Sequence, residues 1–480
     1  MRPYQISLFI FIIIALLVII SLVFPEGGIQ IFGYRFDFPA PQEMIRKKEK
    51  ETIDPELILQ QQELEKLDSL HHEFKDTLTY YAKAMVHPTR FYLPNNDYSF
   101  FDSFFEEAEQ ARSSNHVVRV LHYGDSQIEL DRISINMRNY FQSIFGGSGP
   151  GLLPLYQSIP TASVYQNYSG EYTTYALYGD GLRTQSRDYG LMAKTFQITS
   201  PGSFYVSTSS QERKTKRTPY SNITLLISNL GEQFTATLLQ KGKPAISVDT
   251  IFESGFQTFN WRLDTAISQF SIKMNGWGNI HGILVDGKAG VAVDNIPMRG
   301  ASGTFFSQID AKLLQQTYRT INVKMIVLQF GGNSVPSIYN EKSADKYVDQ
   351  ILSQIDYFHR LFPDLPILFI GPSDMGTRVK GEMGTYPYLP YLVEQLKIRI
   401  PAHGAAFWNM YEVMGGENSM VAWVHKGWAG SDYVHFTPQG AQKIGEILVQ
   451  SFETMYQLYK LRMNNDDVDF DELFQKVQVK

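Results

Sequence analysis

The sequence contains no cysteine among its 480 residues. This absence excludes disulfides, thiolate zinc sites, a cysteine nucleophile and a lipid-modified N-terminal cysteine. It leaves the compartment open, because a large exported domain can be stable without disulfides. The chain also has no long basic stretch, and its formal net charge is −6. We therefore expect no nucleic-acid partner.

Hydrophobic residues make up 43% of the chain, which is enough for two or three domains with their own cores. Residues 8–24 read LFIFIIIALLVIISLVF and carry no charge, which approaches the roughly 20 residues that cross a bilayer. A signal peptide usually has a shorter apolar core and small residues at its cleavage site. We therefore predict an uncleaved membrane anchor over 1–25, with the bulk of the chain on the extracytoplasmic (periplasmic) side.

The next part of the chain predicts a spacer. Within residues 26–97, the first part up to residue 45 contains glycine and proline, and a segment rich in Glu, Lys, Gln and Leu follows at 46–85. This composition favours a juxtamembrane loop followed by a helical stalk. Residues 98–112 read as an amphipathic helix beside the apolar strand that precedes Gly124.

The middle of the chain has a different texture. From about 160 to 285 it is rich in Tyr, Thr, Ser and Val, in short alternating runs such as SNITLLISN and QFTATLLQ. Turn residues separate these runs at short intervals, which is typical of an antiparallel β-sandwich. Its aromatic side chains fit either a core or a sugar-stacking surface, so we assign none of them to binding.

The pattern then changes to apolar strands that alternate with helices, which indicates an α/β fold with a buried parallel sheet. The strands are expected at IHGILVDG (280–287), KMIVLQFGG and LPILFIGP. We predict an α/β domain over 98–158 and 286–460, opened by an inserted β domain over 159–285. An acidic tail follows over 461–480.

Polar residues and glycines lie at the expected carboxyl ends of these strands, where ligands bind in such sheets. They are Gly124-Asp125-Ser126, Gly300 and Gly303, Gly331-Gly332-Asn333, and Asp432 with His435. Taken singly, each fits a local role: Ser126 as a helix cap, the glycines in turns, Asn333 in a loop and the last pair on the surface.

Taken together, they fit acyl transfer, which needs a nucleophile, a base, an orienting acid and oxyanion donors. Ser126 supplies a hydroxyl at a strand-to-helix turn, and His435 can take its proton. Asp432 can hold the other ring nitrogen of His435. The backbone N–H groups of Ser126 and Gly303 and the side-chain amide of Asn333 are candidate donors to the oxyanion.

These blocks resemble the SGNH (GDSL-type) hydrolase family, which has Ser in a GDS block, then Gly, then Asn in a GxN block, then Asp-x-x-His. All four occur here in that order. The resemblance implies a three-layer α/β/α catalytic domain that needs neither a metal nor a cofactor. Gly303, rather than Gly300, matches the family glycine. Two residues depart from the pattern: Gln127 replaces a leucine, and Ser334 follows Asn333 where aspartate is frequent.

The FGGSGPGLLPL segment and the inserted β domain resemble the layout of exported esterases that remove O-acetyl groups from peptidoglycan. This resemblance implies a membrane-anchored serine esterase acting on an acetylated cell-wall or extracellular polysaccharide. A polysaccharide O-acetyltransferase would use the same residues and stays an alternative. A glycan-binding protein without activity is a third hypothesis. The oligomeric state is left open.

Overall fold

The computed structural model describes residues 3–23, 29–31, 34–36, 87, 89–208, 219–229, 233–248 and 254–464. The chain divides into two compact units, Met1–Glu51 and Thr52–Lys480. The first contains helix α1 (Pro3–Val23) and a hairpin of β1 (Ile29–Ile31) and β2 (Tyr34–Phe36). No helix in the described part of the chain has the length and apolar character needed to cross a membrane. The predicted stalk at 46–85 lies outside the described residues.

A six-stranded sheet is the centre of the second unit, with the strand order β16-β4-β17-β18-β21-β3. The strands are β16 (Gly290–Pro297), β4 (Val117–Gly124), β17 (Val323–Gln329), β18 (Ile367–Ile370), β21 (Ala406–Trp408) and β3 (Phe91–Tyr92). All pair in parallel except β3, which is antiparallel at the edge. The predicted parallel α/β sheet is confirmed.

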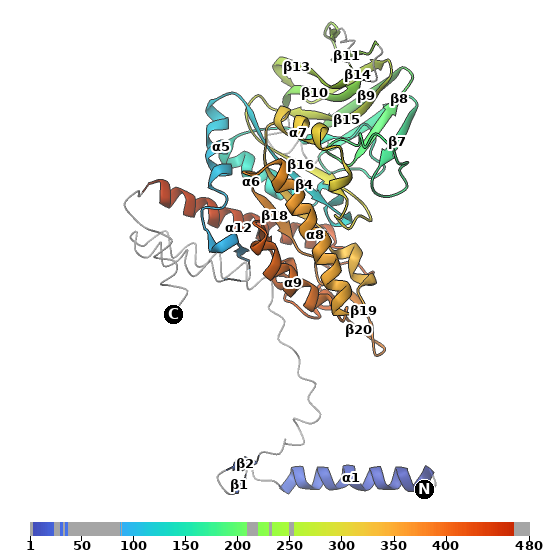
Figure 1. Cartoon of the computed structure of the whole chain (residues 1–480), viewed down its shortest axis with the longest axis vertical. Helices are drawn as coiled ribbons and strands as arrows, with labels where there is room; N and C mark the ends of the chain where they lie inside the picture. Colours follow the sequence, from blue (N-terminus) through green and yellow to red (C-terminus); the bar gives the residue numbers. More distant parts are fainter. Residues whose placement is uncertain are drawn as a thin grey trace. The chain divides into compact units, whose positions relative to one another are not determined.

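Helices cover both faces of this sheet (Figure 1). One face packs against α5 (Asp102–Ser113), α6 (Ser134–Phe145) and α12 (Pro438–Met463), and the other against α7 (Ala311–Thr320), α8 (Glu341–Leu361) and α9 (Leu389–Ala402). Strand β4 explains the layering, because Val120 points into the first core and Leu121 into the second. Because both faces of β4 are buried, its sequence is mostly apolar and does not alternate with polar residues.

Shorter elements connect these layers. They are the 3₁₀ turns η1 (Pro94–Asn96), η2 (Ser126–Asp131), η4 (Phe306–Gln308) and η5 (Gly332–Ser337), helices α10 (Met410–Val413) and α11 (Ser419–His425), and the hairpin of β19 (Gly376–Val379) and β20 (Glu382–Thr385). Local sequence sets the start of α12: Thr437 accepts a hydrogen bond from the backbone N–H of Gly440, and Pro438 follows as the first residue of the helix.

Two antiparallel sheets form the β domain, confirming the antiparallel strands predicted for this region. One has the order β13-β10-β15-β8-β7, with β5 also paired to β15, and the other β12-β11-β14-β9-β6. The strands are β5 (Gly151–Leu153), β6 (Val164–Ser169), β7 (Tyr172–Ala176), β8 (Lys194–Ile198), β9 (Gly202–Thr208), β10 (Tyr220–Asn229), β11 (Thr235–Leu239), β12 (Ile246–Val248), β13 (Gly255–Ile267), β14 (Gln269–Asn275) and β15 (Gly278–Asp286). Side chains such as Phe204 and Trp261 fill the core between them.

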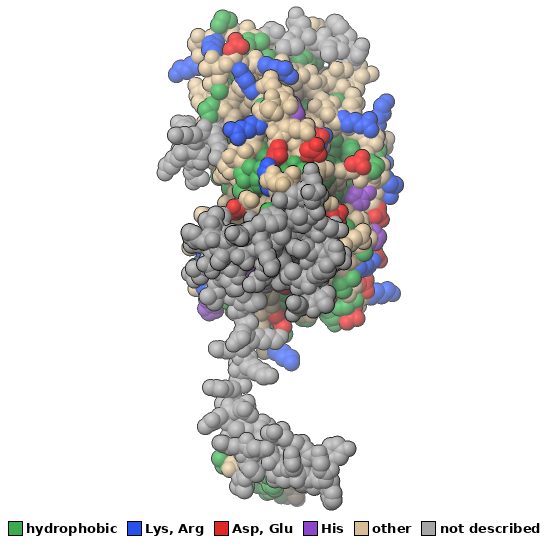
Figure 2. Space-filling model, turned by 90° about the vertical axis from the view of Figure 1, so that its left-hand side faces the viewer, with side chains coloured by type: hydrophobic (Ala, Val, Ile, Leu, Met, Phe, Trp, Pro, Cys, Tyr) green, Lys and Arg blue, Asp and Glu red, His purple; other side chains and the backbone are tan. Residues whose placement is uncertain are grey.

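The face of the β domain that Figure 2 shows carries charges of both signs. Figure 2 shows Lys and Arg side chains interspersed with Asp and Glu over the upper part of the view. The mixture agrees with the modest net charge of −6.

One strand lies in a different sheet from the one that its sequence predicts. The run at 280–287 was expected in the parallel sheet, but it lies in β15 and pairs antiparallel with β10, β8 and β5. The strand that joins β4 in parallel is β16, which follows it. All nine residues of β15 are buried, so its continuous apolar sequence could not distinguish it from a parallel strand.

A buried ion cluster joins the two sheets. Arg119 of β4 donates from Nη1 to Oδ1 of Asp294 on β16 at 2.8 Å, and from Nη2 to Asp286 at the end of β15. Asp294 Oδ1 also accepts the backbone N–H of Leu152 in β5 at 2.9 Å. Burial raises the pKa of Asp294 to about 6, although Arg119 opposes that rise. The cluster therefore ties β5 and β15 of the β domain to β4 and β16 of the parallel sheet.

We expect Arg119→Met to lower the free energy of unfolding by about 3–5 kcal/mol, because it leaves two carboxylates buried without their cation. Urea unfolding at neutral pH measures the loss. The loss should shrink as the pH is lowered, since the unpaired carboxyls can then take up protons. Arg319→Met, at an exposed position of α7, is the control. Equal midpoints for the two variants would contradict this role.

Candidate active site

Ser126 lies directly after β4, in a tight turn rather than at the start of a long helix. Turn η2 begins at Ser126, and its cap is Asp125, whose carboxylate accepts the backbone N–H of Gln127 at 2.9 Å. Leu130 and Asp131 have positive φ values of 64° and 62° and end the turn before α6. The helix expected behind Ser126 is therefore a short 3₁₀ turn, and the residue that caps it is Asp125 rather than Ser126. The Ser126 side chain is left for another contact.

That contact is His435. The Oγ of Ser126 lies 2.8 Å from Nε2 of His435, and Nδ1 of His435 lies 2.8 Å from Oδ2 of Asp432. Ser126 and His435 are 309 residues apart in the chain. The structure thus brings together the three side chains that the sequence singled out, in one hydrogen-bonded row. Such a row can remove the proton from the serine hydroxyl as its oxygen attacks an electrophile.

The loop that carries the histidine is folded tightly around Asp432. Its Oδ1 accepts the backbone N–H groups of Val434 at 3.0 Å and His435 at 3.1 Å, while Tyr433 takes a left-handed φ of 57°. Partial burial raises the pKa of Asp432, but the hydrogen bonds from His435 and Val434 outweigh it, and the net pKa is lowered. Asp432 is therefore ionised at neutral pH and can stabilise a protonated imidazole.

Asn333 and Gly303 occupy neighbouring loops beside the serine turn. Nδ2 of Asn333 donates to the carbonyl of Ala301 at 3.0 Å, and the backbone N–H of Met298 donates to Gly124 at 2.7 Å. A methyl group on Gly332, next to Asn333, would lie 3.4 Å from the carboxylate of Asp125. These contacts place the two loops at the end of β4.

Of the two candidate glycines, position 303 is the more constrained. Both Gly300 and Gly303 have left-handed φ values, 75° and 77°. A methyl group at 303 would lie only 2.6 Å from the ring of Phe330, whereas at 300 it would meet open space. Close approach of the backbone therefore requires glycine at 303.

Gln127 connects the serine turn to the histidine loop, a role that sequence reasoning did not find. Its buried side chain donates from Nε2 to the carbonyl of Val434 at 2.6 Å and accepts the backbone N–H of Phe436 at Oε1, 3.4 Å away. The two contacts lie on either side of His435. The signal in the sequence was a polar amide where the resembling family has leucine.

Arg132 makes a second connection between the same segments. Its Nη2 donates to the carbonyl of Ser126 at 3.1 Å, and its Nη1 donates to the carbonyl of Phe436 at 3.0 Å. Gln127 and Arg132 together hold the backbones of the serine turn and the histidine loop at a fixed separation.

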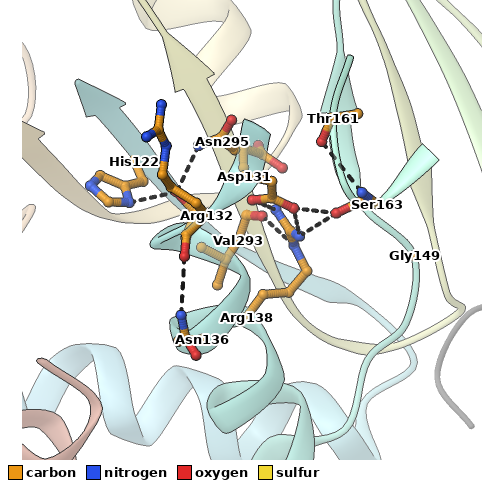
Figure 3. A network of polar contacts seen from close by, with 12 residues as sticks. His122, Asp131, Arg132, Asn136, Arg138, Gly149, Thr161, Ser163, Val293 and Asn295 are labelled. Carbon is orange, nitrogen blue, oxygen red and sulfur yellow. Dashed lines mark hydrogen bonds and ion pairs between the residues drawn. The ribbon is translucent and has the colours of Figure 1, made fainter. Parts of the chain in front are cut away.

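Buried polar groups, among them His122 and Asn295, lie beside the turn (Figure 3). The ring of His122 lies 3.1 Å from Gln329 Oε1 and 2.8 Å from Ser134 Oγ, and Asn295 Nδ2 donates to Ser134 Oγ and to the carbonyl of Ile128. Burial lowers the pKa of His122 to about 4, so this ring is neutral at pH 7. It supports the turn and does not exchange protons there.

An ion pair closes the far end of the same turn. Arg138 of α6 donates to both carboxylate oxygens of Asp131 and, through Nε, to the carbonyl of Val293 at 2.8 Å. Ser163 also donates to Asp131, and Figure 3 shows the four groups converging. The turn is therefore anchored to α6, to β16 and to the entry of the β domain.

Within the described ranges, no group of three or more His, Asp and Glu side chains is arranged to hold a metal ion.

No protein-family model matches the chain, and no curated protein matches its sequence. Among solved structures, one described as a peptidoglycan O-acetylesterase in action is similar, with a TM-score of 0.60 and 20% identity over 77% of this chain and 98% of that one. A family two carbohydrate esterase from Clostridium thermocellum, in complex with cellohexaose, is matched over 61% of this chain and 99% of that one at 12% identity, with a TM-score of only 0.24. The chain has an SGNH-type (GDSL-like) hydrolase fold.

Proposed function

We propose that this protein is a serine esterase that removes O-acetyl groups from an extracytoplasmic polysaccharide through an acetyl-serine intermediate. The observation that carries the proposal is the unbroken row of hydrogen bonds from Ser126 through His435 to Asp432. A row of this kind, at the strand ends of an α/β sheet, suits acyl transfer.

In the first step, Oγ of Ser126 forms a bond to the acetyl carbonyl carbon, and the hydroxyl proton passes to Nε2 of His435. The carbonyl electron pair moves onto oxygen. When the tetrahedral intermediate collapses, the bond from carbon to the sugar oxygen breaks, and His435 returns the proton to that oxygen. Water then repeats the sequence on the acetyl-serine and releases acetate. Asp432 keeps the imidazole oriented and stabilises its charged form.

Three donors are proposed for the developing oxyanion: the backbone N–H groups of Ser126 and Gly303 and the side-chain amide of Asn333. One amide hydrogen of Asn333 is directed to the carbonyl of Ala301. An amide nitrogen carries two hydrogens, so the second is available to the substrate. The bond to Ala301 then fixes the direction of the second donor, which is the preorganisation that such sites need.

The substrate class comes from the similar structure. The peptidoglycan O-acetylesterase structure is matched over 98% of its own length and 77% of this chain. We infer that the present chain also acts on an O-acetylated glycan outside the cytoplasm. Membrane attachment enters the proposal from the sequence alone, through the uncharged run at 8–24. Recovery of the full chain in the membrane fraction after an alkaline wash tests that part.

Ser126→Ala tests the nucleophile. We expect hydrolysis of 4-nitrophenyl acetate, and acetate release from O-acetylated peptidoglycan, to fall by about 10⁴-fold or more, because the alanine cannot form the acyl-enzyme. The thermal unfolding midpoint should stay near that of the parent chain. Undiminished turnover by a correctly folded variant would refute the proposed function.

Asn333→Ala should lower kcat by roughly 10²–10³-fold with a smaller change in KM, because the amide acts on the charge that develops in the transition state. Asn333→Asp is the matched comparison. It keeps the shape but places a carboxylate beside the oxyanion, so its kcat should be lower still. Steady-state kinetics with 4-nitrophenyl acetate measure both variants. A change confined to KM would contradict the assignment.

Gln127→Leu tests the positioning of the histidine. Leucine fits the buried site but removes both contacts beside His435, so kcat should fall roughly tenfold to a hundredfold while KM changes little. The rate at which a fluorophosphonate labels Ser126 should fall in parallel. Gln127→Glu keeps the acceptor for Phe436 and should recover part of the rate. Loss of thermal stability with unchanged kcat would show a purely structural role.

A further inference from the structure

A cavity of about 290 Å³ lies where the β domain meets the edge of the parallel sheet. One wall comes from β7 and β8 and from the segment that carries Tyr156, and the other from Glu129, Pro297 and Arg299. Glu129 belongs to the same η2 turn as Ser126, and Pro297 is paired with Gly124 at the end of β4. The cavity therefore shares a boundary with the candidate active site.

Its β-domain wall is aromatic. Tyr156 is 42% exposed, and its ring lies 5.6 Å from that of Tyr172 at an interplanar angle of 33°. Tyr172 is supported edge-on by Phe196, 5.7 Å away. A pyranose ring presents an apolar face of C–H groups that packs well on rigid aromatic rings of this kind, while its hydroxyls find polar partners.

The charges in the cavity do not balance. Arg299 and Glu129 neutralise one another through two contacts, 2.8 Å from Nε and 2.5 Å from Nη2. Lys194 of β8 also lines the cavity. Its ammonium lies 4.7 Å from the centre of the Tyr178 ring, and among the residues the structure describes no carboxylate lies within ion-pair distance of it. Burial lowers its pKa.

A half-buried cation without a counter-charge is costly, and a ligand carboxylate would relieve that cost. We propose that this cavity binds a carboxylate-bearing sugar of the glycan, with the sugar ring against Tyr156 and Tyr172 and the carboxylate paired with Lys194. The inference rests on the proposed function and narrows its substrate to an acidic O-acetylated polysaccharide. A neutral glycan would leave the ammonium of Lys194 unpaired.

Binding can be measured without catalysis in the full chain carrying Ser126→Ala. The probes are N-acetylmuramic acid and N-acetylglucosamine, which share the ring and the N-acetyl group and differ by an ether that carries a carboxylate. Titration by NMR should show that the acid binds about tenfold or more tightly, as a charged hydrogen bond predicts. Lys194→Met should abolish that preference. Lys273→Met, which removes an exposed lysine from the other sheet, should keep it.

A second measurement separates this inference from the proposed function. With Ser126 present, Lys194→Met should hydrolyse 4-nitrophenyl acetate at the parent rate, because that ester has no sugar. Its unfolding midpoint should not fall, since methionine replaces an unpaired charge. Equal affinity for the two sugars, or no binding of the acid, overturns the cavity assignment even if the esterase is active. Tyr156→Ala should weaken the binding of both sugars, whereas Lys194→Met should weaken the binding of the acid alone. A general folding defect in the lysine variant would therefore be recognised by the loss of both sugars.

Discussion

The buried contact of Arg119 with Asp286 and Asp294 is the constraint on which the rest of this molecule depends. The β domain leaves the parallel sheet after α6 and returns at β16, so its entry and exit have to meet beside β4. Arg119 fixes that meeting with charge-assisted hydrogen bonds in a region from which water is excluded. Because Ser126 lies two residues beyond the end of β4, and β16 leads into the loop that carries Gly303, the same contact sets the separation of the proposed nucleophile and one of its oxyanion donors.

A second constraint closes the site from the other end of the chain. Nothing local holds His435 near Ser126, since the two lie on separate segments. Gln127 and Arg132 supply the connection by bonding the backbone on both sides of the histidine, and not its ring. The ring therefore keeps both nitrogens for Ser126 and Asp432. This division of labour suits a base, whose own hydrogen bonds have to change during the reaction.

Much of this architecture could be predicted because parallel strands end at one edge of their sheet. The order of the blocks was enough to predict that Ser126, Asp432 and His435 meet, although their roles stay predictions. The features that the sequence did not predict correctly depend on contacts between distant segments. The fully buried β15 has the same sequence signature as a parallel strand. Leu130 ends the η2 turn with a positive φ. Because the residue is not glycine, the sequence does not reveal this conformation. In the sequence, Gln127 is only a departure from the family pattern. Its role depends on the backbone of the histidine loop, which lies beside it in the structure.

Lys194, which has no carboxylate partner among the described residues, belongs to the same arrangement. If Lys194 served the fold alone, a carboxylate partner or an apolar side chain would cost less, yet nearby Glu129 is already taken by Arg299. Glu129 also lies in the turn that bears Ser126, so a sugar held in the cavity would press against the element that carries the nucleophile. Binding energy gained away from the ester could then orient the acetyl group for attack, which contributes to rate only when both parts belong to one rigid frame. The ion cluster at Arg119 provides that frame, and the β domain thereby becomes part of the proposed substrate site.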